Sequence, residues 1–132
     1  MRYRLFITIA FLTILSVGSY AQKHAPNKQM PAWYKAHGGI ATAHVYFPDY
    51  FAFYDAGRQG FVYWAQNKWV FSPTVPLYLQ KVDLSKSRIK ILDGLSLDLH
   101  PEMNYPNYMK LYPADPKSEP LNVPVPNIQH SK

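Results

Sequence analysis

Hydrophobic residues alternate with polar or small residues over the middle of the chain, which is the period of β-strands rather than of helices. Three short segments rich in aromatic and β-branched residues are separated by turn-forming residues: 51–55, 61–65 and 68–72. Opposing Asp55 to Gly60, and turning the chain at Gln66-Asn67, gives one consistent antiparallel register. That register puts six apolar side chains on one face: Phe51, Phe53, Val62, Trp64, Trp69 and Phe71. Since a one-residue slip would scatter them over both faces, the pattern predicts a three-stranded meander with this face as its core.

A second stretch of alternation follows residue 88, where aliphatic side chains occupy odd positions: Ile89, Ile91, Leu95, Leu97 and Leu99. A two-residue turn at Asp93-Gly94 would oppose Ile91 to Ser96 and break the pattern. A three-residue loop that ends in a left-handed Gly94 instead pairs Ile91 with Leu95. The pattern therefore predicts a second antiparallel hairpin.

The remaining pieces of the core are short. Residues 44–47 either extend the first strand or form a strand of their own, with Pro48 marking a bend or a sheet edge. Helical turns are expected within 76–87 and over 104–112. The second helix would pack three side chains against the sheet: Tyr105, Tyr108 and Met109. Together these elements predict a mainly β, small α+β fold, an antiparallel meander plus a second hairpin, over residues 44–112.

Both ends of the chain differ from this core. Residues 22–43 mix Pro, Gly and small polar residues, and predict a flexible arm with one helical turn around 33–36. Residues 113–132 hold five prolines and no aromatic residue, so we expect a disordered or polyproline II tail. With 132 residues in all, the chain has room for one domain.

The first 21 residues have the layout of a secretory signal peptide. Arg2 and Arg4 precede a largely apolar run over 5–17. Small residues at Ser19 and Ala21 then stand three before and directly before the expected cleavage point. The run is shorter than the about 20 residues of a membrane span, a retained N-terminal anchor being the alternative. The sequence predicts export to the periplasm or beyond, with no transmembrane segment after cleavage.

Charge and cysteine content narrow the functional classes. The chain has 14 Lys and Arg against 8 Asp and Glu, and removal of residues 1–21 leaves 12 against 8. Because the basic residues are spread along an exported chain, nucleic acid is not an expected partner. Anionic envelope polymers or an ordinary solvated surface explain the charge instead. The absence of cysteine excludes disulfides, a thiolate metal site and a cysteine nucleophile.

Catalytic and metal-binding motifs are weak in this sequence. His37 and His44 are separated by six residues that include a Gly-Gly pair, so we expect surface histidines rather than metal ligands. Asp49 and Asp55 flank one strand and resemble a glycosidase acid pair in type. The preferred interpretation is structural: Asp49 forms a bend, and Asp55 opens the 56–59 turn through its side-chain oxygen. No Gly-x-Ser-x-Gly elbow or phosphate-binding loop occurs, and we expect no catalytic residue, metal or cofactor.

Several short motifs follow one another along residues 31–112. In chain order they are Trp33, Ala36, His37 and Gly38; Tyr46-Phe47-Pro48-Asp49; Tyr54-Asp55; Phe61 to Trp64; and Trp69-Val70-Phe71-Ser72 with Val75-Pro76. In this order and spacing the chain resembles a family of small exported proteins of Gram-negative bacteria that has no established activity. The chain departs from the family in Pro73 and in an arm with fewer histidines. The resemblance implies the compartment and the kind of fold, but no mechanism.

The aromatic face opposite the predicted core is the candidate binding surface. The predicted contact residues on this face, at its rim and in the adjoining turn are Tyr54, Arg58, Phe61, Tyr63 and Lys68. Aromatic rings can stack on sugars, so an exposed face of this kind would suit an envelope polysaccharide or an envelope protein. If the arm or residues 104–112 cover the face, it is a second core instead.

These observations favour an exported cell-envelope protein without enzymatic activity, which acts as a binding or structural module through an aromatic β face. One alternative is a small hydrolase-like or accessory enzyme that acts on envelope glycan through Asp49 and Asp55. A second alternative is a protein–protein module that pairs through a free strand edge at 44–47.

Overall fold

The structure, a computed structural model, describes residues 30–39, 42–117, 123, 125 and 126. Its centre is a five-stranded antiparallel sheet in the order β4-β3-β2-β1-β5. The strands are β1 (His44–Phe47), β2 (Ala52–Asp55), β3 (Gly60–Ala65), β4 (Lys68–Ser72) and β5 (Lys90–Leu92). The helical pieces are α1 (Ala32–Ala36), η1 (Pro48–Tyr50), η2 (Leu77–Leu79), η3 (Pro101–Asn104) and α2 (Tyr105–Leu111), where η marks a 3-10 helix. The predicted mainly β, small α+β class is confirmed.

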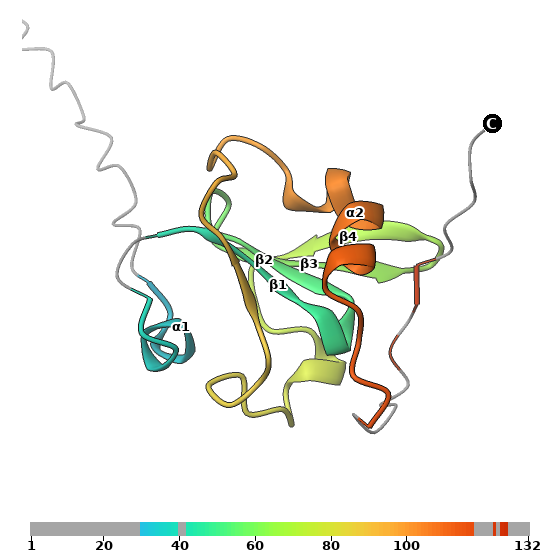
Figure 1. Cartoon of the computed structure of the whole chain (residues 1–132), viewed down its shortest axis with the longest axis horizontal. Helices are drawn as coiled ribbons and strands as arrows, with labels where there is room; N and C mark the ends of the chain where they lie inside the picture. The colour runs from blue at the N-terminus through green and yellow to red at the C-terminus, as the bar shows by residue number, and fades with distance from the viewer. Residues whose placement is uncertain (1–29, 40–41, 118–122, 124, 127–132) are drawn as a thin grey trace, which may run out of the picture.

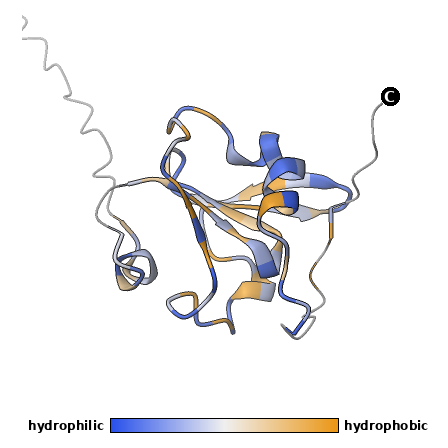
Figure 2. Ribbon diagram, in the orientation of Figure 1, coloured by the Kyte–Doolittle hydropathy of each residue, from blue (hydrophilic) through white to orange (hydrophobic). Residues whose placement is uncertain are grey.

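The predicted meander has the expected register. Asp55 pairs with Gly60 in β2 and β3, and Trp64 pairs with Trp69 in β3 and β4. The two-residue turn between β3 and β4 has both residues in the left-handed region, with φ of 49° at Gln66 and 61° at Asn67. This is the turn geometry whose twist matches that of antiparallel strands. Figure 2 shows the strands mainly in orange and pale colours and the tip of this hairpin in blue.

Strand β1 lies in the interior of the sheet. It pairs with β2 on one side and with β5 on the other, and all four of its residues are buried. The predicted free edge at 44–47 is therefore wrong. The chain reverses into β2 through η1 and through Phe51, whose φ of 46° is unusual for a bulky residue. The edge strands are β4 and β5.

The predicted second hairpin is also wrong. β5 pairs with β1, and residues 95–99 form turns instead of a strand. The Leu95 N–H donates to the Leu92 carbonyl, and the Leu99 N–H donates to the Ser96 carbonyl, so these groups serve turns rather than a ladder. Gly94 is not left-handed, because the one described glycine with positive φ is Gly38. Leu95, Leu97 and Leu99 occupy alternate positions within these turns, which is the same spacing as on one face of a strand.

The sheet is covered on both sides. The first side, here called the Trp33 face, packs under α1 and η2; its buried residues include Val45, Phe47, Ala52, Tyr54, Phe61, Tyr34 and Leu79. The second side, the α2 face, packs under α2; its buried residues are Tyr46, Phe53, Val62, Leu92 and Tyr105. Figure 1 shows α2 on one side of the sheet, and α1 and the yellow η2 segment on the other. The two sets follow from strand alternation.

Parts of both chain ends contact this core. The predicted signal peptide 1–21 and residues 22–29 of the predicted arm lie outside the described residues. The described part of the arm forms α1, as expected for 33–36, but Tyr34 is 3% exposed, which corrects the expectation of a free arm there. At the other end, the Asp115 N–H donates to Asp49, and Arg88 donates to the Pro113 carbonyl. No helix in the described part of the chain has the length and apolar character needed to cross a membrane.

Candidate functional site

The predicted contact residues do not form one exposed surface. Tyr54 and Phe61 are 8% and 4% exposed, and both pack against Trp33, with ring centroids 5.3 Å and 6.2 Å away. Tyr63 is half-buried beside Tyr78 of η2, at 5.8 Å. The alternative in which the arm covers this face is the one that the structure adopts. The face predicted for binding is the main core of the protein.

The face predicted as the core is the less completely covered one. Phe53 and Val62 are buried on it, but Trp64 and Trp69 are only half-buried and Phe71 is 37% exposed. Both faces carry alternating aromatic residues, so the pattern alone did not distinguish them. The Trp33 face is covered by α1 together with η2 and the segment that follows it, whereas the other face is covered mainly by α2 and the residues next to it.

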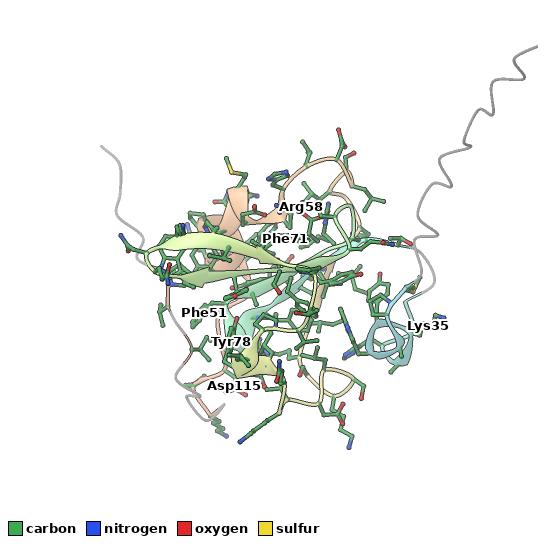
Figure 3. The ribbon with its side chains drawn as sticks, turned by 180° about the vertical axis from the view of Figure 1, so that it is seen from behind. Lys35, Phe51, Arg58, Phe71, Tyr78 and Asp115 are labelled. Carbon is green, nitrogen blue, oxygen red and sulfur yellow. The ribbon has the colours of Figure 1, made fainter. Side chains whose placement is uncertain are left out.

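Arg58 joins two buried acids at one end of the α2 face. Its backbone N–H donates to Asp55 Oδ1 at 3.0 Å, which confirms the predicted role of Asp55 in opening the turn. The guanidinium donates from Nε to Asp55 Oδ2 at 2.6 Å, and from a terminal nitrogen to Glu102 Oε1 at 3.1 Å. It also lies over Phe71, with its carbon 4.9 Å from the ring centroid, and Figure 3 shows the two side by side.

Electrostatics favour the charged form of this arginine. Partial burial by itself lowers the pKa of Arg58, but the hydrogen bond and charge of Asp55, with those of Glu102, raise it overall. Asp55 is 1% exposed, so the ion pair satisfies a carboxylate that has almost no access to water. Glu102 lies 44 residues from Arg58 along the chain, which is why strand patterns did not reveal it.

Asp49, the other acid considered for glycan hydrolysis, is held by Arg88. It also accepts the Asp115 N–H at 2.8 Å. Burial acts to raise the pKa of Asp49, but the hydrogen bonds from Arg88 and Asp115 and the charge of Arg88 lower it overall. Asp49 and Asp55 thus each have an arginine partner.

His44 is a buried structural residue rather than the surface residue expected. It is fully buried, its Nδ1 accepts the Ala56 N–H at 3.1 Å, and its Nε2 lies 3.0 Å from the Ser96 carbonyl oxygen. Since Nδ1 must carry a lone pair to accept from Ala56, the network assigns the proton to Nε2 and a neutral ring. The 3.4 Å approach of Nδ1 to Asp55 Oδ1 is therefore a close contact and not an ion pair. Within the described residues, no three His, Asp or Glu side chains cluster as metal ligands would.

A trough of about 270 Å³ runs beside β5. Its walls are the consecutive residues 90–95, with Tyr108 and Tyr112 at the C-terminal end of α2. Successive side chains of a strand point to opposite faces, so a trough that touches three consecutive β5 residues follows the strand's edge. Lys90 Nζ lies 5.2 Å from the ring centroid of Tyr112.

The trough was not predicted from the sequence. The alternation over 89–99 predicts a hairpin there, and the free edge expected from the sequence lies at 44–47. The spacing of Tyr108 and Tyr112 was visible, and a helix of that period lines them up on one side. Which strand lies beside Tyr108 and Tyr112 depends on the pairing of β5. Another cavity, bordered by Tyr34 and Tyr54, has about 10 Å³, room for no more than a water molecule.

Comparison with protein-family profiles, with curated proteins and with solved structures finds no match to this chain.

Proposed function

We propose that this protein is an exported, non-enzymatic binding module of the cell envelope that captures an extended segment of a partner protein at the β5 edge. The observation that carries the proposal is the trough between β5 and the end of α2. β5 pairs with β1 on one side, and no described strand pairs with its other side. An edge strand offers main-chain donors and acceptors to a partner strand.

Side chains at the walls of the trough add the specificity that pairing to a strand edge lacks. Main-chain hydrogen bonds give affinity without sequence preference, while pockets for alternate side chains give specificity. Here Leu95, Tyr108 and Tyr112 provide apolar and aromatic surface beside the edge. A partner protein suits these main-chain groups better than a polysaccharide does, because two of the aromatic residues expected to stack on sugars, Tyr54 and Phe61, are buried.

Export is supported by the N-terminal sequence. Arg2 and Arg4, the apolar run over 5–17 and the small residues at Ser19 and Ala21 follow the order that the secretion machinery reads. An exported protein meets its partners outside the cytoplasm. The family resemblance points to the same compartment.

The test uses the full chain, expressed with its own N-terminal segment in a Gram-negative host and purified as the cell processes it. Intact mass is expected to match a chain that begins at Gln22. The product is then used to select binders from a random peptide library displayed on phage, and the enriched peptides are titrated into ¹⁵N-labelled protein. We expect shifts concentrated at residues 90–95 and at Tyr108 and Tyr112.

Gly94 offers a matched pair of variants for this test. Gly94 lines the trough, and a Cβ there meets no other atom within 4 Å, so there is room for a large side chain. Gly94→Trp is expected to fill the trough and weaken peptide binding by about tenfold or more, while Gly94→Ala leaves it nearly unchanged. Unfolding curves check that both variants fold. Failure to enrich any peptide, or equal binding to Gly94→Trp, would overturn the proposal, and an uncleaved chain would overturn its export half.

A further inference from the structure

Two side chains of opposite charge line the trough. Lys90 is the first residue of β5, and Asp93 directly follows its last residue. Neither takes part in the ion pairs found among the described residues. Asp93 does lie near enough to Tyr34 to add to the rise in that tyrosine's pKa, which burial mainly causes. The charge beside the trough thus changes from positive to negative in the direction of β5.

Lys90 is held in place by its surroundings. Its ammonium lies over the Tyr112 ring, an arrangement in which the face of the ring attracts the cation. Arg88, two residues earlier, is already engaged by Asp49 and by the Pro113 carbonyl. The cation at the trough wall is therefore Lys90. A carboxylate is the group that a partly desolvated ammonium binds best in a peptide.

Strand direction then decides where that carboxylate lies. β5 runs from Lys90 towards Asp93, so a segment that pairs antiparallel to β5 brings its C-terminal end to Lys90. A parallel segment would bring its C-terminal end to Asp93, and like charges side by side oppose association. The positions of Lys90 and Asp93 along β5 therefore favour a segment that pairs antiparallel to this strand.

On the basis of the proposed function, we infer that the trough binds an extended peptide segment antiparallel to β5, with a carboxylate at the C-terminal end of the segment against Lys90. The carboxylate belongs to an acidic side chain of the partner. The opposite end of the segment, beside Asp93, favours a basic or neutral residue. The other candidate occupant of an open edge, a second copy of this chain, is an outcome of the test.

The test uses fluorescein-labelled hexapeptide pools that are randomised at five positions. The sixth position carries Glu, Gln or Lys, placed either at the carboxyl end or at the amino end, and all pools have amidated C-termini. Anisotropy with the processed full-length product is expected to show about tenfold tighter binding for Glu at the carboxyl end than for Lys there. The preference should weaken as salt is raised.

Variants of matched charge separate the trough from the overall charge of the protein. Lys90→Glu is expected to reverse the preference so that the pool with Lys at the carboxyl end binds best. Lys110→Glu, an exposed position on α2 that does not line the trough, should leave the preference unchanged. Analytical ultracentrifugation of the protein alone tests for the second copy.

The outcomes separate the two proposals. If no pool binds and the protein is a monomer, the proposed function fails, and this inference fails with it. If pools bind and Gly94→Trp abolishes the binding, but Glu is preferred at the amino end or at neither end, only the inferred orientation and carboxylate are wrong. Dimers that Gly94→Trp dissociates would make a second copy the occupant and would also overturn the inference.

Discussion

The Trp33 face and the α2 face are built from the same kinds of residue, but they differ in packing and in the polar groups that they bury. On the Trp33 face, Trp33 contacts Phe47 and Tyr54 edge-on or tilted, at centroid distances of 5.2 Å and 5.3 Å. The α2 face buries two polar groups, His44 and Asp55, among its aromatic residues. It also borders the trough through Tyr108 and Tyr112.

The α2 face also contains a buried hydroxyl that makes no hydrogen bond within the described part of the chain. Tyr46 is fully buried, and its hydroxyl has no hydrogen-bond partner among the described residues. Burial, with a smaller effect of Tyr105, raises the pKa of this phenol and keeps it neutral. A buried hydroxyl of this kind costs about 1–3 kcal/mol. The comparison indicates that one face supplies most of the stability, while the other positions an arginine and an open edge at some cost.

The largest effect should come from removing a ring from the Trp33 face. Phe47 is fully buried, so Phe47→Ala is expected to lower the free energy of unfolding by about 3–5 kcal/mol through lost burial and the cavity that remains. Phe71→Ala on the α2 face, where the ring is 37% exposed, should lower it by only about 1 kcal/mol. Urea unfolding followed by tryptophan fluorescence measures both. Equal losses would show that the two faces contribute alike.

The next effect tests the buried charges of the α2 face. Arg58→Met leaves the carboxylates of Asp55 and Glu102 without their cation. It should lower the free energy of unfolding by roughly 2–3 kcal/mol, less than for a fully buried pair because the guanidinium is partly exposed. Adding Asp55→Asn and Glu102→Gln should restore part of the loss. Lys86→Met, which breaks an exposed pair with Asp83, is the control and should leave stability nearly unchanged. A similar small change in Arg58→Met would contradict this account.

The smallest effect concerns pH and Asp49, which lies beside Tyr46 at the border of the α2 face. The pKa of Asp49 is lowered in the folded state from its ordinary value of 3.8, so its ionised form stabilises the fold above that pH. The contribution should be lost as the pH falls below about 4 and through the lower folded pKa. Because Arg88 is well exposed to solvent, we expect less than about 1 kcal/mol.

Unfolding curves between pH 3 and pH 6 measure this contribution. Asp49→Asn should be less stable than the unchanged chain at pH 6, and the difference should shrink towards pH 3. Asp93→Asn, an exposed acid outside the ion pairs, is the control. A constant difference across the range would assign the effect of Asp49→Asn to packing rather than to charge.

The turn at Asp55 is the part of the described sites that could be predicted locally. Asp55 and Arg58 lie three residues apart in one turn, so turn chemistry anticipated their contact. Glu102 and the trough could not be anticipated, since each depends on segments more than a dozen residues apart. The role of His44 was missed because its partners, Ala56 and Ser96, come from two different turns.

The sequence by itself determined the meander, its register, the turn at Gln66-Asn67 and the helix near the C-terminal end of the core. These features follow from alternation, turn preference and helical spacing, which act between residues close in the chain. The tertiary structure alone decided which aromatic face is covered by α1, that β1 is central, and that β5 pairs with β1 and leaves an open edge. Alternation tells which side chains share a face, but it does not tell what packs on that face. That choice depends on the free energy of contacts between distant segments, which no local pattern records.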